Sequence, residues 1–167
     1  NIERLRKHTL PVVYDIDSRQ QVLLTRNELV RVMPGNRWDA DWALLRDPSA
    51  EIISQQWDYA APESLFVKNL NNGAMKFIGD APSGFSEMSA AGKYVIWFND
   101  RNYYAYEIET GTTRLISSGV KFPLWDEDQD IPMIPSPYGI AGWSENDAEL
   151  FVYDRHDIWA LDPKGEK

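Results

Sequence analysis

The stretch SPYGIAGWSENDAELFVYDRHDIWALD, residues 136–162, carries the pattern on which the fold assignment rests. It contains three short apolar runs, Ile140–Trp143, Leu150–Tyr153 and Ile158–Leu161, separated by polar residues. Short apolar runs between polar turn residues are typical of β-strands. The sequence Asp162-Pro163-Lys164-Gly165 then predicts a further turn. The stretch therefore predicts an antiparallel β-meander.

Similar units occur earlier in the chain. A polar turn that ends in glycine follows an apolar strand at Gly73, Gly111 and Gly165, at intervals of 38 and 54 residues. A period near 40 residues with four strands per unit is the signature of β-propeller blades. The other predicted strands are Leu10–Asp15, Gln21–Arg26, Glu28–Met33, Trp42–Arg46, Glu51–Tyr59, Ser64–Leu70, Ala74–Ile78, Phe85–Ser89, Tyr94–Phe98, Tyr103–Ile108 and Thr113–Ile116.

We therefore expect an all-β fold, a partial β-propeller of about three to four blades built as four-stranded antiparallel meanders. A β-sandwich or a meander barrel would give similar strands without internal similarity. The expected propeller fragment spans residues 1–167, with residues 121–137 as an insertion. Its blades are predicted at about 10–36, 38–80, 84–120 and 138–167. The last blade lacks a fourth strand, so we expect a piece of a larger protein that self-associates through open blade edges.

Composition narrows the function classes. The net charge of −9 argues against a nucleic-acid partner, which requires a basic face. The chain has no cysteine, which removes disulfides, thiolate metal sites and cysteine nucleophiles. No apolar run approaches the roughly 18 residues of a membrane span. The hydrophobic content of 43% is sufficient for a packed core.

The densest cluster of carboxylates is Trp125-Asp126-Glu127-Asp128-Gln129-Asp130, in the insertion. Asp126, Asp128 and Asp130 are candidate calcium ligands, because hard cations prefer several carboxylate and carbonyl oxygens. The spacing lacks the central glycine and terminal glutamate of a helix–loop–helix calcium loop, which favours a solvated acidic loop. A carboxylate-based enzyme that also uses Glu127 is a weaker alternative, and no other cofactor is expected.

No catalytic residue is expected in this chain. A serine hydrolase would need a Gly-x-Ser-x-Gly elbow, and Gly84-Phe85-Ser86-Glu87-Met88 lacks the final glycine. The two histidines, His8 and His156, lie far apart in the sequence, and His156 stands in a charged turn.

Most aromatic residues fall inside predicted strands, where they would fill the core between blades. The aromatic residues nearer turns are better candidates for an exposed, sugar-binding face: Trp57, Tyr59, Trp125 and Tyr138. Three arginines could recognise a carboxylate, although a surface salt bridge is the expected role of each: Arg46, Arg101 and Arg155.

Several segments together resemble the propeller of prolyl oligopeptidase-family serine peptidases, of the large secreted kind common in Bacteroidetes and similar to dipeptidyl and acylaminoacyl peptidases. The resemblance covers about residues 38–167, and its most specific part is Pro137–Trp143 with Tyr153–Trp159. The other matching segments are residues 91–97, 104–111, 125–128 and 162–163.

In that family, a propeller stands over an α/β-hydrolase domain that carries the catalytic triad. The resemblance implies that this chain is the non-catalytic propeller segment, which restricts access to the active site and helps to hold the peptide substrate. It implies a hydrolase domain of the same parent chain as partner, and a periplasmic or secreted location. Glu63, Glu107 and Glu109 do not form a recognisable version of the glutamate pair that binds the substrate amino terminus in dipeptidyl peptidases. A stand-alone protein- or glycan-binding propeller remains the alternative.

Overall fold

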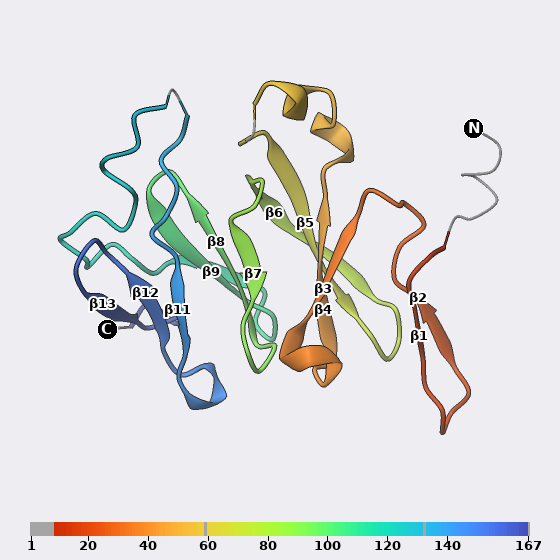
Figure 1. The fold of residues 1–167 in the computed structure, drawn as a ribbon. Coiled ribbons are helices and arrows are strands. Elements are labelled where there is room, and N and C mark those ends of the chain that lie inside the picture. The colour runs from red at the N-terminus through yellow and green to blue at the C-terminus, as the bar shows by residue number, and fades with distance from the viewer. Residues whose placement is uncertain (1–8, 59, 132, 167) are drawn as a thin grey trace.

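The structure is a computed structural model that describes residues 9–58, 60–131 and 133–166. Within these residues the fold is all-β, with four antiparallel sheets that follow one another in chain order. Figure 1 shows the sheets across the molecule, from red at β1–β2 to blue at β11–β13.

The sheets contain two, four, four and three strands. The first sheet contains β1 (Val12–Tyr14) and β2 (Gln21–Leu23), and the second contains β3 (Arg31–Pro34), β4 (Trp42–Asp47), β5 (Pro62–Asn69) and β6 (Met75–Pro82). The third sheet contains β7 (Ser86–Met88), β8 (Tyr94–Asn99), β9 (Asn102–Glu107) and β10 (Thr112–Leu115). The fourth sheet contains β11 (Ile140–Trp143), β12 (Leu150–Tyr153) and β13 (Ile158–Leu161).

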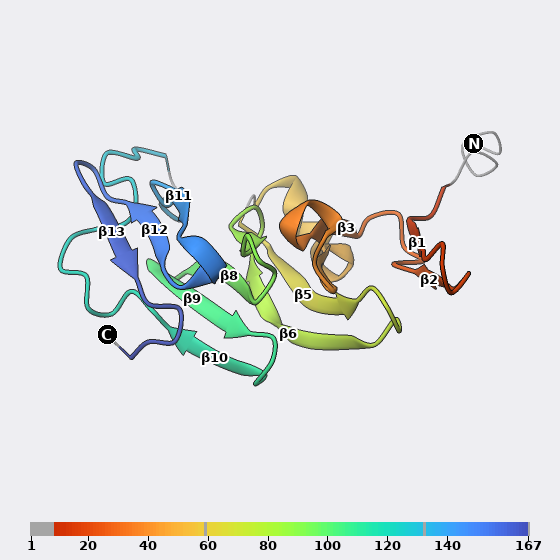
Figure 2. The same cartoon turned by 90° about the horizontal axis from the view of Figure 1, so that it is seen from below.

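Each pair of successive sheets packs face to face around its own apolar cluster. Alternation along β4 explains how one sheet serves two clusters: Ala43 and Leu45 face the first sheet, and Leu44 between them faces the third. The third sheet likewise contributes Val95 to the cluster shared with the second sheet and Ile96 to the cluster shared with the fourth. Figure 2 shows the sheets in succession from a second direction. Meander sheets stacked in this way form part of a β-propeller.

The turns confirm the repeat predicted from the glycines. Gly73, Gly111 and Gly165 have φ angles of +74°, +72° and +65° and follow the third strand of the second, third and fourth sheets. Glycine adopts this left-handed conformation without the steric cost that a side chain brings. The hairpin between β8 and β9 uses Asp100 and Arg101, both with positive φ, as a two-residue turn with the twist that antiparallel strands need.

Two predicted elements differ from the structure. The predicted strand Glu28–Met33 was placed at the end of the first blade, but β3 pairs with β4 and so opens the second sheet. The short link Gly35–Trp38 folds as a 3-10 turn that brings the two strands side by side. The predicted strand Glu51–Tyr59 instead contains 3-10 turns at Ser49–Glu51 and Ser54–Gln56, and its Ile52 and Ile53 are exposed.

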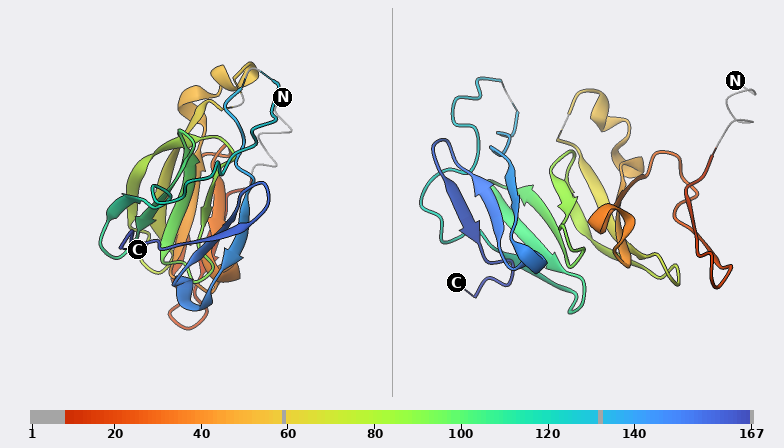
Figure 3. Two further views of the ribbon diagram at one scale, coloured as in Figure 1. Left: turned by 90° about the vertical axis from the view of Figure 1, so that its left-hand side faces the viewer. Right: turned by 60° about the horizontal axis from the view of Figure 1, so that its bottom comes forward.

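The insertion at residues 121–137 is anchored at its base. Leu124 is buried in the cluster between the third and fourth sheets, and Trp125 forms a bridge with Pro137. The Asp126 amide donates to the Ser136 carbonyl at 2.8 Å, and the Tyr138 amide donates to the Leu124 carbonyl at 3.0 Å. The rest of the insertion extends beyond the strand ends (Figure 3). No helix in the described part of the chain is long and apolar enough to cross a membrane.

Candidate functional site

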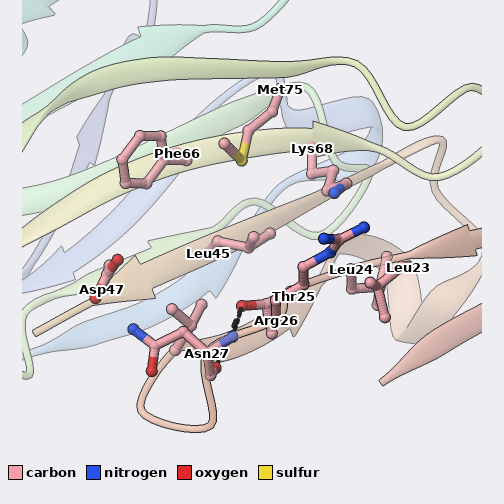
Figure 4. A pocket seen from close by; sticks show the side chains of 11 residues that line it. Leu23, Leu24, Thr25, Arg26, Asn27, Leu45, Asp47, Phe66, Lys68 and Met75 are labelled. Carbon is pink, nitrogen blue, oxygen red and sulfur yellow. Dashed lines mark hydrogen bonds between the residues drawn. The ribbon is translucent and has the colours of Figure 1, made fainter. Parts of the chain in front are cut away.

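A hollow of about 500 Å³ lies between residues 23–30 and the face of the second sheet. Figure 4 shows Leu45, Phe66 and Met75 on the side of that sheet, opposite the segment that carries Leu24 and Asn27. Two of its polar residues are already engaged, since the Asn27 amide donates to Thr25 Oγ1 at 3.0 Å and the Asn27 side chain donates to Ser49. The hollow arises because a two-stranded sheet covers only part of a four-stranded one.

A smaller cavity, of about 290 Å³, lies between the third and fourth sheets beside β7 and β11. This volume is near the lower end of the roughly 300–1,000 Å³ typical of ligand sites. Two titratable side chains, Glu87 and Tyr103, reach it. Ser86 also lines the cavity, and the rest of the lining is apolar side chains and glycine backbone, from Gly84, Phe85, Phe98, Pro137, Gly139 and Ile140.

Strand register places Glu87 at this cavity. Glu87 pairs with Ile96, whose side chain belongs to the cluster between the third and fourth sheets. Because side chains alternate along a strand, Glu87 projects toward the fourth sheet, and its neighbours Ser86 and Met88 project toward the second. A carboxyl group therefore enters a largely apolar interface between two sheets.

The surroundings of Glu87 disfavour its charged form. Burial raises the pKa of the Glu87 carboxyl, and the nearby indole N–H of Trp143 acts in the opposite direction. Among the residues that the structure describes, no lysine, arginine or histidine forms an ion pair with Glu87. The carboxyl is thus held in the cavity without a compensating charge.

Two further polar groups lie beside Glu87. The Tyr103 side chain is 2% exposed, and its hydroxyl has no hydrogen-bond partner in the described structure. Burial and the proximity of Glu87 raise the pKa of the Tyr103 phenol, an effect that the Gly139 backbone amide opposes. The Trp143 Nε1–H is also buried and lies close to Glu87. Buried polar groups are normally paired, so this cluster is exceptional.

The predicted calcium ligands are not gathered into a metal site. Asp126 accepts the backbone N–H of Asp128 at 3.0 Å, and the exposed Asp128 carboxylate pairs with Arg155 at 2.8 Å. In the described ranges, no three histidine, aspartate, glutamate or cysteine side chains are close enough to hold a metal ion. Asp130 and Glu127 are exposed on the same loop, as expected of a solvated acidic segment.

The arginines take three different roles. Arg46, expected at the surface, is buried: its Nε donates to Glu63 Oε2 at 2.7 Å, and the prediction of a surface pair was wrong for this residue. Arg101 lies over the Trp125 ring at 5.2 Å, and Arg155 forms the expected surface pair with Asp128. The candidate glutamates are dispersed as well, because Glu63 pairs with Arg46 and Glu107 with Arg114.

The aromatic, histidine and serine candidates lie in different parts of the structure. Trp57 is 70% exposed, whereas Trp125 and Tyr138 are partly buried. His156 stands exposed in a turn, where its backbone N–H donates to Asp154. Ser86 lies within β7 and not on a strand-to-helix turn, consistent with the lack of an elbow motif. Tyr59 and His8 lie outside the described residues.

The cluster of Glu87, Tyr103 and Trp143 was not predicted from the sequence. One signal was present: in the predicted strand Phe85–Ser89, the alternation places Glu87 on the same face as the apolar Phe85. A carboxylate on the apolar face of a strand is unusual and marks a position to inspect.

No protein-family model and no curated protein sequence matches this chain. Among solved structures, the crystal structure of TolB from Acinetobacter baumannii is similar, with a TM-score of 0.47 and 12% sequence identity. The similarity covers 92% of this chain and 35% of that protein, so the chain spans about a third of its length.

Proposed function

We propose that this chain is the non-catalytic propeller segment of a secreted or periplasmic serine peptidase of the prolyl oligopeptidase family. In this role it gates and positions peptide substrates for a separate α/β-hydrolase domain of the same parent chain. The proposal is supported by the sequence resemblance at Pro137–Trp143 and Tyr153–Trp159, which lie in the fourth sheet and in the segments that lead into its strands.

The observation that carries a binding role is the cavity beside β7 and β11. It brings Glu87 together with the buried Tyr103 hydroxyl, which lacks a hydrogen-bond partner, and Trp143 lies beside Glu87. A buried polar group without a partner carries a free-energy cost of about 1–3 kcal/mol, which a ligand that supplies the missing hydrogen bond would remove. The chain offers no nucleophile elbow beside it, so binding without turnover is the expected activity.

The test is a titration of the isolated chain with short peptides, followed by nuclear magnetic resonance, with mass spectrometry of the peptides afterwards. We expect saturable shifts of protein signals and intact peptides. Hydrolysis that survives repurification and disappears on substitution of one serine would overturn the non-catalytic role. The absence of any peptide-induced shift would overturn the positioning role.

A stand-alone glycan- or protein-binding propeller is the second candidate, favoured by the exposure of Trp57. Aromatic faces open to solvent are common at binding surfaces. If this candidate holds, Trp57→Ala abolishes binding to a glycan panel and Tyr103→Phe leaves it unchanged. The opposite result, with peptide binding weakened by Tyr103→Phe alone, favours the peptidase segment.

A further inference from the structure

The cavity between the third and fourth sheets offers hydrogen-bonding groups of two kinds. The Tyr103 hydroxyl, in the lining, is a buried donor without an acceptor. The buried indole N–H of Trp143 lies next to Glu87, beside the cavity. The Glu87 carboxyl is an acceptor without an ion-pair partner in the described part of the chain. A ligand that satisfies both kinds must carry an acceptor oxygen and an N–H or O–H donor within one small group.

The walls of the cavity are apolar and already in place. Phe98 packs edge-to-face against Phe85, with ring centroids 6.4 Å apart, and against Tyr103 at 5.0 Å. Trp143 stacks on Tyr94 at 6.2 Å. These contacts hold both donor side chains in position, and preorganised groups bind a ligand at a low cost in conformational entropy. The volume of about 290 Å³ suits one small group rather than an extended ligand.

The charge of a small ligand group decides whether it suits this cavity. An ammonium ion carries donors only, so it offers no acceptor to the Tyr103 hydroxyl. A carboxylate would bring its charge into apolar walls in which no cation of the described residues pairs with Glu87. Burial already disfavours the charged form of Glu87, and a second charged group would have to be desolvated in the same surroundings. A neutral ligand avoids each of these costs.

A primary carboxamide meets these requirements, because its oxygen accepts hydrogen bonds and its NH₂ group donates them. We propose that the cavity beside β7 and β11 binds the carboxamide side chain of a glutamine or asparagine in a peptide. The carboxamide oxygen accepts from Tyr103, and the NH₂ group donates to Glu87. This inference rests on the proposed peptide-binding function and adds a preference for one side chain.

The indole N–H of Trp143 provides a reporter at the site, assigned through the Trp143→Phe variant. The ¹⁵N-labelled chain is titrated with acetyl-Ala-Gln-Ala-N-methylamide and with the same peptide carrying methionine or lysine in place of glutamine. We expect a saturable shift of the Trp143 signal with the glutamine peptide, and at least about tenfold weaker binding of the other two.

Tyr103→Phe removes a hydroxyl that has no partner in the free protein, so we expect it to fold normally. Loss of its hydrogen bond to the ligand weakens binding of the glutamine peptide about two- to tenfold. Tyr104→Phe is the matched control, because Tyr104 is the next residue of β9 and packs against the cluster on the opposite side of the third sheet. We expect the Tyr104→Phe variant to keep the peptide affinity and the thermal midpoint of the unsubstituted chain.

Each other outcome overturns the inference. Stronger binding of the lysine peptide would show a cation site, and a Trp143 shift with methyl glucoside in place of the glutamine peptide would show a sugar site. If peptides shift other signals and leave Trp143 unmoved, the peptide-binding function stands and the carboxamide site falls. If no peptide shifts any signal, the proposed function falls with it.

Discussion

Arg46 and Glu63 show what a single residue's sequence context can and cannot predict. An arginine near a strand end suggests a surface ion pair, because its side chain can usually reach water. The register of β4 and β5 instead places the Arg46–Glu63 pair on the face that packs against the third sheet, where Arg46 and Glu63 are 6% and 1% exposed. Glu63 also accepts from Ser83 Oγ at 2.9 Å. Burial by a later sheet leaves no trace in the local sequence.

We expect Glu63→Ala to lower the free energy of unfolding by about 3–5 kcal/mol, because it leaves the Arg46 guanidinium buried without a counter-charge. Urea unfolding measures this loss. The double variant Arg46→Met/Glu63→Leu removes both charges and recovers much of the stability. As a control, Asp128→Ala breaks the exposed pair with Arg155 and changes stability by about 1 kcal/mol at most. Equal effects of Glu63→Ala and Asp128→Ala would refute the argument.

The candidate site also depends on packing between sheets, which the local sequence does not reveal. The sequence drew attention to Asp126, Asp128 and Asp130 because carboxylates are dense there, yet density marks a solvated loop. Glu87 stands alone between Ser86 and Met88, and its importance depends on the cavity that it shares with Tyr103 and on Trp143 beside it, which belong to other strands. Only the pairing of sheets brings these three side chains together.

At the scale of elements, β11, β12 and β13 begin and end at the predicted residues, because apolar runs there are short and flanked by polar turns. The prediction of a strand at Glu51–Tyr59 is wrong, since its isoleucines are surface residues between two 3-10 turns. The sequence does not predict that the turn before β12 is hydrogen-bonded to the third sheet. Asp147 there is 2% exposed and accepts from Ser89 Oγ at 2.6 Å and from the Ala91 amide at 2.8 Å.

Asp147→Ala tests this lock between sheets. The substitution leaves the Ser89 hydroxyl and the Ala91 amide without their acceptor and places alanine at a φ of +58°. We therefore expect a loss of about 2–4 kcal/mol in the free energy of unfolding. Hydrogen exchange at the Ala91 amide speeds up in the variant. Glu145→Ala, in the same turn but exposed, is the control and leaves both quantities nearly unchanged. Unaltered protection of Ala91 in Asp147→Ala would contradict the lock.

For the whole molecule, the glycine-marked repeat predicted the propeller arrangement because each blade reuses one turn chemistry. The repeat could not show that the first sheet in the described part of the chain has only two strands, since β3 is apolar enough to suit either neighbour. The stack also has two outer faces. Val12 and Tyr14 are 48% and 56% exposed on the first sheet, and Tyr153 and Ile158 are 41% and 57% exposed on the fourth.

These outer faces lead us to expect that the isolated chain self-associates, since propeller sheets normally bury both faces. Tyr153 and Ile158 are paired across β12 and β13 beside the turn that joins them, so the double variant Tyr153→Lys/Ile158→Lys puts two like charges on the fourth sheet's outer face. Burial of one large apolar side chain is worth about 1.5–3 kcal/mol, and we expect the association constant to fall about tenfold or more. Sedimentation velocity over a range of concentrations measures it. Trp57→Lys, which alters an equally exposed apolar side chain away from both end sheets, is the control and leaves association unchanged. A chain that stays monomeric at the highest concentration, or a Trp57→Lys variant that dissociates as readily as the double variant, would show that these sheet faces do not drive association.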